Sequence, residues 1–498
     1  MMLSILEQAE KFKDKAAIYS DGQSYTFQDL INKSGHLANI ILQDENDLKE
    51  ARVAFMVNPG FGYVQTLWAI WQAGGVAVPL CITHPLPSLE YVLDDTEADI
   101  IILSAEYLDT LNPYFQKKTI RVILFESLVD TNNITSLPAI NSSRKALILY
   151  TSGTTNKPKG VVTTHENIEA QITTLVSSWE WSNTDHVLCV LPLHHVHGII
   201  NVIGCAMWSG AACTFIPHFS AATVFDLFSE RNINVFMAVP TIYFKLIAFL
   251  ETLAQDNRDL LKLVMQRFRL MVCGSAALPV SVMEKWEALS GQKLLERYGM
   301  TELGMAISNP YRGNRRAGYV GLPLPGVSIK LVDETYEEVN EGEPGEIIVK
   351  GKNVFLEYWQ KPEATRKTFT SDGWFKTGDI AIVENGYYRI MGRNSVDIIK
   401  SGGYKISALE IEEVLRLYDS IDDCAVVGIN DDEWGELIVA AIVVIPDKQN
   451  TFNEKELSNW IVQKIASYKK PRKYLVVDEL PRNAMGKVVK NDVKKLFE

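Results

Sequence analysis

The chain has 498 residues, of which 47% are hydrophobic and 22% are charged. This composition is typical of a globular protein with a large core, and the length fits two to four domains. The net charge of −12 argues against binding to nucleic acids or to anionic membrane surfaces, because both are themselves negative. We therefore expect no nucleic-acid partner and no integral membrane segment.

The first half of the chain alternates short apolar runs with amphipathic segments. Residues 51–57 and 76–80 are predicted to form strands, and residues 62–74 a helix between them. Similar apolar runs recur at residues 98–104, 186–192, 211–217, 234–239 and 269–274. Strands that alternate with helices predict a parallel sheet with helices on both faces.

One uncharged stretch, residues 198–217, is long enough to span a bilayer. Its glycines and polar residues, and the lack of a flanking basic cluster, instead predict a buried helix followed by a buried strand. The N-terminus shows no basic segment before a long apolar one, so no signal peptide is expected. Six cysteines without C-x-x-C spacing predict free thiols in a reducing compartment, and we expect the cytoplasm.

The pattern changes in the last third of the chain. Between about 317 and 392, short β-rich runs separated by Gly and Pro predict a small antiparallel sheet or barrel. Residues 398–498 contain two helical patterns and three strand-like runs, which predict a compact α+β unit. We predict that the two parts meet within GRNSVD, residues 392–397.

A loop of unusual composition follows the apolar strand in ALILYTSGTTNKPKG, residues 146–160. Its Ser, Thr and Lys side chains can donate hydrogen bonds to phosphate, and Gly153 and Gly160 let the backbone approach an oxyanion closely. The spacing departs from G-x-x-x-x-G-K-[ST], because Val161 stands where a lysine would be required. We predict a polyphosphate-binding loop and a following helix capped by Thr164; the alternative is an ordinary polar turn.

Four further motifs follow in order: LLERYGMTE (294–302), GWFKTGD (373–379), GRNSVDIIKSGGYKI (392–406) and PRNAMGK (481–487). With the loop, they make the chain resemble the adenylate-forming family, which includes acyl-CoA synthetases, adenylation domains and beetle luciferases. The resemblance covers essentially the whole chain. It implies an α/β fold: a large N-terminal domain of two α/β lobes and a β-barrel, and a small mobile α+β C-terminal domain.

The resemblance also implies the domain boundaries and the reaction. The N-terminal domain would span residues 1–392, the hinge 393–397 and the C-terminal domain 398–498. The carboxylate of an acid would attack the α-phosphate of ATP, giving acyl-AMP and pyrophosphate, and the thiol of CoA would then displace AMP. ATP, Mg²⁺ and CoA are thus the implied cofactors. Many relatives have an Asp or Lys as hinge residue where this chain has Ser395.

Roles in the nucleotide site are implied residue by residue. Tyr298 would stack on adenine, and Asp379 and Arg393 would hold the ribose. Thr301 would bind the phosphate and Glu302 the Mg²⁺, which neutralises charge as pyrophosphate leaves. The other implied ATP-binding residues are Thr151, Ser152, Gly153, Thr154, Thr155, Lys159, Gly274, Ser275, Ala276, Gly299 and Met300. The alternatives from the residues alone are a packed tyrosine and a capping aspartate.

Further residues are implied for the two half-reactions. Lys487 would contact the carboxylate and the α-phosphate in one orientation of the small domain; the alternative is a solvated lysine. His195 would gate or assist between the half-reactions, and Lys400, Gly402 and Gly403 would lie beside the pantetheine arm. The alternatives for His195 are a core histidine, or a metal site with His194 and His197. No Cys or carboxylate lies near enough in sequence to complete a zinc set.

The acid substrate is predicted from one cation. Arg297 stands where related aryl and fatty acyl enzymes often have a small residue, and its guanidinium could bind a second carboxylate. Several motifs closely resemble malonyl-CoA synthetases, which have a further Arg where this chain has Lys245. We therefore predict a ligase for a short dicarboxylic acid, malonate or methylmalonate. The alternatives are another acid, a carrier-protein thiol as acceptor, or a nucleotide-binding protein without catalysis; Arg297 could also pair with Glu296 or Glu302.

Overall fold

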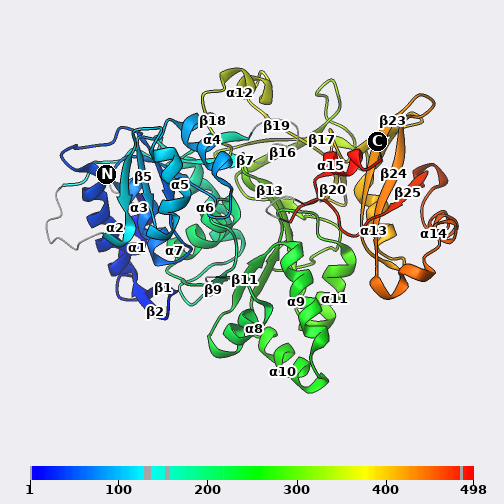
Figure 1. The fold of residues 1–498 in the computed structure, drawn as a ribbon, viewed down its shortest axis with the longest axis horizontal. Coiled ribbons are helices and arrows are strands. Elements are labelled where there is room, and N and C mark those ends of the chain that lie inside the picture. Colours follow the sequence, from blue (N-terminus) through cyan, green and yellow to red (C-terminus); the bar gives the residue numbers. More distant parts are fainter. Residues whose placement is uncertain (1–2, 128–135, 152–157, 217, 483–485, 498) are drawn as a thin grey trace.

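Four β-sheets organise the chain in the computed structural model, which describes residues 3–127, 136–151, 158–216, 218–482 and 486–497. Three sheets are built from residues up to Arg393, and the fourth from residues after 397 (Figure 1). The two larger sheets carry most of the helices, so the predicted fold class, two α/β lobes with β-rich and α+β additions, is confirmed.

The first lobe is a seven-stranded sheet in which five neighbouring strands are parallel. In sheet order its strands are β18 (Glu357–Tyr358), β8 (Lys159–Thr164), β7 (Lys145–Thr151), β4 (Val76–Pro79), β3 (Arg52–Met56), β5 (Ile100–Leu103) and β6 (Arg121–Leu124). Its helices are α2 (Phe27–Leu42), α3 (Phe61–Gln72), α4 (Leu86–Thr96), α5 (Leu108–Phe115) and α6 (His165–Ser178), with the short turns η1 (Ala105–Tyr107) and η2 (Phe125–Ser127). The strand and helix predictions for residues 51–104 are thereby confirmed.

The second lobe is a nine-stranded sheet, parallel in its centre and antiparallel at both edges. In sheet order its strands are β15 (Leu322–Pro323), β14 (Gly304–Ser308), β13 (Leu295–Met300), β12 (Leu270–Cys273), β11 (Val235–Ala238), β9 (His186–Cys189), β10 (Ala212–Phe215), β1 (Ala16–Ser20) and β2 (Gln23–Thr26). Its helices are α1 (Ser4–Glu10), α7 (Cys205–Ser209), α8 (Ala221–Glu230), α9 (Pro240–Thr252), α10 (Gln255–Met265) and α11 (Val280–Ser290), together with η3 (His197–Gly204).

The described part of the uncharged stretch, residues 198–216, contains a buried helical segment and then the buried strand β10, as predicted. Its first part, η3, is a π-helix, a form that is rare and concentrated at functional sites. Among the described residues, no helix combines the length and the apolar character that crossing a bilayer requires.

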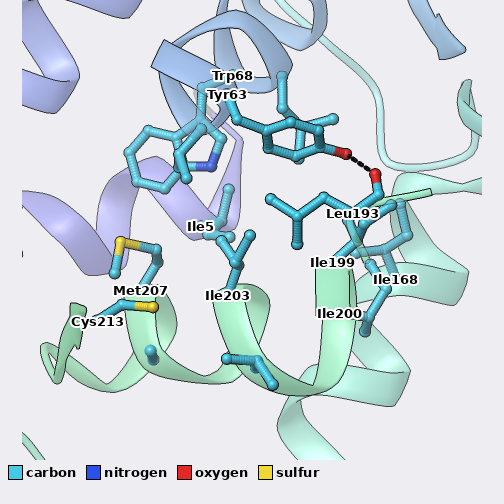
Figure 2. Close-up of a cluster of buried hydrophobic side chains, with 14 of the residues drawn as sticks. Ile5, Tyr63, Trp68, Ile168, Leu193, Ile199, Ile200, Ile203, Met207 and Cys213 are labelled. Carbon is cyan, nitrogen blue, oxygen red and sulfur yellow. Dashed lines mark hydrogen bonds between the residues drawn. The ribbon is translucent and has the colours of Figure 1, made fainter. Parts of the chain in front are cut away.

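A continuous core joins the two lobes. Figure 2 shows Tyr63 and Trp68 of α3 facing Ile199 and Ile203 of η3 across this core. The Tyr63 hydroxyl donates a hydrogen bond of 2.5 Å to the carbonyl oxygen of Leu193, in the loop before η3. This bond fixes a loop of the second lobe against a helix of the first.

The β-rich part is a four-stranded antiparallel sheet with the short helix α12 (Pro362–Thr368) beside it. In sheet order its strands are β16 (Val327–Val332), β17 (Gly345–Gly351), β19 (Phe375–Glu384) and β20 (Tyr387–Arg393). The strand β20 ends at Arg393, and the chain then turns into the last unit, which lies at the right of Figure 1.

The last unit is a five-stranded sheet with three helices, as the α+β pattern predicts. Its strands are β22 (Tyr404–Ser407), β21 (Ile398–Ser401), β24 (Gly435–Val444), β23 (Ile421–Asp431) and β25 (Lys473–Val476), which pairs with β24 in parallel. Its helices are α13 (Ala408–Leu415), α14 (Glu454–Ile461) and α15 (Lys490–Lys495), with the short turns η4 (Pro446–Thr451) and η5 (Ser467–Lys469). All six cysteines of the chain are buried and free.

Candidate active site

The predicted phosphate loop lies at the end of an antiparallel pair of strands. Thr151 of β7 pairs with Lys159 of β8, and the helix α6 begins only after β8. Thr164 caps α6, accepting a hydrogen bond from the Asn167 N–H, as predicted. Of the predicted loop residues, Ser152, Gly153, Thr154 and Thr155 lie outside the described residues.

Three residues predicted to bind the nucleoside lie together. Asp379 of β19 and Arg393 of β20 are cross-strand partners, with 3.0 Å between the Arg393 Nε and Asp379 Oδ1 atoms. The Tyr298 hydroxyl donates a hydrogen bond of 2.6 Å to the other oxygen, Asp379 Oδ2. Burial, and then the Asp379 charge, raise the pKa of Tyr298 well above its usual range, so Tyr298 stays protonated as a donor. The carboxylate is thus oriented by two donors, one on each oxygen.

Glu302 is buried just beyond this cluster. Its Oε1 atom accepts a hydrogen bond of 2.9 Å from the hydroxyl of Tyr358, and burial raises the pKa of the carboxyl above its usual range. The Lys159 ammonium lies 4.7 Å from the centroid of the Tyr358 ring, so the loop lysine and Glu302 meet at one tyrosine. Sequence reasoning did not identify Tyr358, which has no place in any of the recognised motifs.

Two cavities open beside these residues. They measure about 290 and about 460 Å³, and both are lined by Thr377, Gly378 and Arg393. Met300 and Glu302 line the first cavity, and Lys400 lines the second. The residues predicted for the nucleotide and one residue predicted for CoA therefore border neighbouring spaces.

The glycines of the motifs make room for close contacts. A Cβ atom on Gly299 would lie 1.9 Å from the carbonyl oxygen of Gly304, where β13 turns back into β14. Thr301 is in that same turn. Gly402 and Gly403 have φ angles of +57° and +84° and form the turn between β21 and β22. Most other side chains would be strained there.

Arg297 is buried on β13 with only 3% of its surface exposed. Its Nη2 atom lies 3.4 Å from the Ser275 hydroxyl, and its Nε atom has no hydrogen-bond partner among the described residues. Burial lowers the pKa of the guanidinium to about 10, so it remains charged near neutral pH. A Cβ atom on Gly274 would lie 2.6 Å from Arg297 Cζ, so any other residue at 274 would force the guanidinium to move.

The alternative pairing of Arg297 with a neighbouring carboxylate is not present. Glu296 accepts a hydrogen bond of 3.1 Å from the Leu278 N–H, and its Oε2 atom has no described partner. Successive side chains of a strand point to opposite faces, so Glu296 makes no ion pair with Arg297, although its charge acts to raise the pKa of the guanidinium. Within the described part of the chain, no carboxylate oxygen lies within ion-pair distance of the Arg297 guanidinium.

Ser275 links two of these groups. Its hydroxyl also lies 3.1 Å from Nδ1 of His197, and its φ angle of +71° is uncommon for a residue with a side chain. The exposed Ala276 follows it in the same turn after β12. Strained backbone of this kind is concentrated at functional sites.

The three histidines of LPLHHVHG have different neighbours. His197 faces Ser275, whereas the ring centroids of His194 and His195 lie 4.0 Å apart. Burial lowers the pKa of His195 to about 3, and its Nε2 atom has no partner among the described residues. His194 lies instead beside Cys81 and His84. A shared site for the three imidazoles is therefore not formed, and the neutral His195 has a free ring nitrogen.

Lys245 does not join Arg297. It lies exposed on α9, with its ammonium 5.7 Å from the centroid of the Phe219 ring. Lys487 belongs to the C-terminal unit, but the preceding Gly486 lies against Thr241 in the first turn of α9. The loop that contains Lys487 therefore approaches the second lobe.

Comparisons with known proteins agree with this arrangement. Residues 5–359 match the AMP-binding enzyme family, and residues 410–487 match the AMP-binding enzyme C-terminal domain. The chain is 42% identical to malonate–CoA ligase ACSF3, mitochondrial, of Bos taurus, over 98% of this chain and 90% of that protein. It is 38% identical to malonate–CoA ligase of Arabidopsis thaliana, over 99% and 88%. The crystal structure of ATP-bound MatB from Rhodopseudomonas palustris superposes with a TM-score of 0.90 at 31% identity, covering 100% of this chain and 99% of that one. The chain belongs to the AMP-binding enzyme family.

Proposed function

We propose that this protein is an ATP-dependent acid–thiol ligase that converts malonate, or the similar methylmalonate, to its CoA thioester through an acyl-adenylate. The named malonate–CoA ligases among its relatives support the choice of acid. The ATP-bound MatB structure, with the same fold over the whole chain, supports ATP as the activating substrate.

One observation supports a dicarboxylate most directly, and it is the isolation of Arg297. Its guanidinium is buried and charged, and its described hydrogen-bond partner is a neutral hydroxyl. Burying an unpaired charge costs on the order of several kcal/mol, so buried charged groups normally have a counter-ion. A second carboxylate on the substrate would supply this counter-ion. A monocarboxylate would leave the guanidinium unpaired.

The nucleotide would lie against the cluster that Tyr298 forms with the Asp379–Arg393 pair. Asp379 presents two oriented oxygens, which suit the two hydroxyls of a ribose. Lys159 and the loop hydroxyls would bind the phosphates. These assignments rest on the clustering of Tyr298, Asp379 and Arg393 and on the ATP-bound relative.

Glu302 fits a Mg²⁺ ligand. It is a buried carboxylate whose described side-chain partner is a neutral tyrosine, and Mg²⁺ is commonly held by one or two carboxylates together with substrate phosphates. The ion would supply charge neutralisation as pyrophosphate departs. Tyr358 would orient Glu302 by holding one of its oxygens.

The hinge is proposed to lie in residues 394–397, where the two units meet. Asp397 contacts both units: its Oδ1 atom lies 3.4 Å from the ammonium of Lys490 in α15, and its Oδ2 atom accepts a hydrogen bond of 3.0 Å from the Arg393 N–H. Arg393 is held by its pair with Asp379, and the Asn394 N–H donates a hydrogen bond of 2.9 Å to the Gly378 carbonyl oxygen. A rotation of the small domain would have to change these contacts.

The proposed location is the cytoplasm, supported by the six free cysteines, which suit a reducing compartment. Several relatives carry the word mitochondrial in their names. Fractionation of cells that express the full chain would test the proposed location, and recovery with mitochondria would contradict it.

An acid panel tests the proposed activity. The purified enzyme is incubated with ATP, Mg²⁺, CoA and each of malonate, methylmalonate, succinate, propionate and butyrate, and thioesters are measured by mass spectrometry. We expect malonyl-CoA to form with the highest kcat/KM. A preference for propionate or butyrate would refute the dicarboxylate proposal. Acid-dependent ATP–pyrophosphate exchange without any CoA thioester would indicate a different acceptor thiol.

A further inference from the structure

Three soft or borderline metal ligands converge where the two α/β lobes meet. Cys81 and His84 follow β4 of the first lobe, and His194 follows β9 of the second. The Cys81 sulfur and one nitrogen from each imidazole all lie within 4.8 Å of one another. None of the three is among the residues proposed above to bind ATP, Mg²⁺ or CoA, although His194 precedes His195 in the chain.

The local backbone holds the first two ligands in place. The sequence Cys81-Ile82-Thr83-His84 forms a turn that is closed by a hydrogen bond of 3.1 Å from the His84 N–H to the Cys81 carbonyl oxygen. The Cys81 sulfur also lies 3.3 Å from the hydroxyl of Thr83. A C-x-x-H turn is short enough to bring both side chains to one side and let them act as a pair.

The third ligand is held just as firmly. His194 follows Leu193, whose carbonyl oxygen accepts the hydrogen bond of Tyr63 from the first lobe. Cys81 is 5% exposed, and both histidines are partly buried. The cluster is therefore fixed from both sheets and still open on one side.

We propose that Cys81, His84 and His194 bind a zinc-class divalent cation. Thiolate and imidazole are the preferred ligands of Zn²⁺, at about 2.3 Å and about 2.0–2.1 Å from the metal. Tetrahedral ligands at those lengths are about 3.5 Å apart, so the observed separations need only small side-chain rotations. The three ligands contain no carboxylate, which disfavours Mg²⁺ and Ca²⁺.

Such an ion would have three protein ligands and an open fourth position for water, unlike closed structural zinc sites. Its neighbour would be His195, whose ring lies 4.0 Å from that of His194. Binding of the cation would thus hold the loop that contains His195 and would tie the two lobes together. This inference does not depend on which acid the enzyme uses.

Cobalt absorption tests the site directly. Full-length enzyme is stripped of metal with a chelator, kept reduced without added thiol, and titrated with Co²⁺. We expect one equivalent to bind with a thiolate-to-cobalt charge-transfer band, and Zn²⁺ to displace it. Cys81→Ser should abolish the band. His84→Gln and His194→Gln should each weaken binding by at least about tenfold.

Two control variants match the test variants in residue type. Cys424→Ser removes a buried cysteine of the C-terminal unit, and His218→Gln removes an exposed histidine of the second lobe. Both should keep the band and the affinity. Melting curves show which variants fold. If Cys81→Ser does not fold, His84→Gln, at a half-buried position, tests the site in its place. A wild type without a stoichiometric band, or a band that survives in folded Cys81→Ser, would overturn the proposal.

Discussion

Gly486 rests against Thr241: a Cβ atom on Gly486 would lie 3.4 Å from Thr241 Cγ2. The contact joins the loop of the C-terminal unit to the first turn of α9 in the second lobe. A second contact supports it, since the Val280 N–H donates a hydrogen bond of 3.2 Å to Glu413 Oε2. The small domain is therefore turned so that Lys487 approaches the large one, which is the orientation proposed for adenylation.

The first prediction follows from that orientation. Lys487→Ala should abolish acyl-AMP formation, because the lysine would stabilise charge that develops at the α-phosphate. Thioester formation from synthetic acyl-AMP and CoA should be largely spared. The two half-reactions are measured separately, by pyrophosphate exchange and by release of AMP. Lys494→Ala, in the same basic tail, is the matched control, and an equal fall in both half-reactions would contradict the assignment.

Arg297 should discriminate between acids. In Arg297→Gly, kcat/KM for malonate should fall by at least about a hundredfold, near the 3 kcal/mol expected when a buried charge loses its partner. The kcat/KM for butyrate or propionate should fall little, because neither acid has a second carboxylate that would lose its partner.

Arg297→Met controls for the lost volume, since it keeps an apolar side chain in the buried position. Lys245→Met, at an exposed position, should lower kcat/KM for malonate less than either Arg297 variant does. Equal losses for malonate and butyrate in both Arg297 variants would point to disturbance of the adjacent Tyr298 instead.

Two changes in the phosphate loop should weaken the use of ATP. Lys159→Ala and Thr154→Ala would each remove one proposed charge-assisted contact with the phosphates, worth about 1.5–3 kcal/mol, so kcat/KM for ATP should fall roughly 10- to 150-fold. Lys145→Ala is a close control, because this lysine begins the same strand pair and its ammonium likewise lies over an aromatic ring, 5.1 Å from the centroid of Trp359. Unchanged kinetics for both loop variants would show that the loop does not bind the phosphates.

The buried ion cluster of Lys490 should be important for stability. Its ammonium lies between Asp397 and Glu412, with 10% of its side chain exposed. Lys490→Met would remove the ammonium from Asp397 and leave Glu412 with its longer pair to Arg416, at 3.8 Å. Loss of this buried cation should cost about 3–5 kcal/mol in the free energy of unfolding. Denaturant unfolding measures this cost. Lys495→Met removes an exposed ion pair and should cost less than about 1 kcal/mol, and a similar cost for both would refute the role of the cluster.

Stability should fall below neutral pH, in part through His165. Burial, and then the Arg144 charge, lower its pKa to about 3 in the folded protein, against about 6.5 when unfolded. Between those values only the unfolded chain binds the proton, so folding loses about 1.4 kcal/mol per pH unit as the pH falls. His165→Gln should flatten the dependence by that slope. Parallel stability curves for the two proteins between pH 7.5 and 5 would disprove this.

Motifs with a local physical cause were predictable from the sequence. The capping of α6 by Thr164 depends on residues three apart, and the clustering of Tyr298 with Asp379 and Arg393 follows from complete motifs. The strand β8 between the loop and α6 was not predicted, because KGVVTT continues directly into the helical pattern without a turn signal.

Contacts between segments that are far apart in the chain could not be predicted from the sequence. Cys81 and His194 are separated by more than a hundred residues, and only the meeting of β4 and β9 ends brings them together. Lys245 lies in a recognised motif, but the rotation of α9 about its axis decides whether it faces the pocket or solvent, and that depends on packing. Tyr358 reaches Glu302 through the edge strand β18, which no motif covers.

The strand pair β7–β8 has a consequence for how the enzyme responds to salt. A phosphate loop that opens directly into a helix draws on the partial positive charge of the helix N-terminus. Here the loop is joined to antiparallel strands, which have only small net dipoles. Without a helix dipole, lysine charge such as that of Lys159 would carry a larger share of the attraction for triphosphate, beside the hydroxyls and the proposed Mg²⁺. Such charges are screened over a Debye length of about 8 Å at physiological ionic strength, so the KM for ATP should rise steadily with added salt.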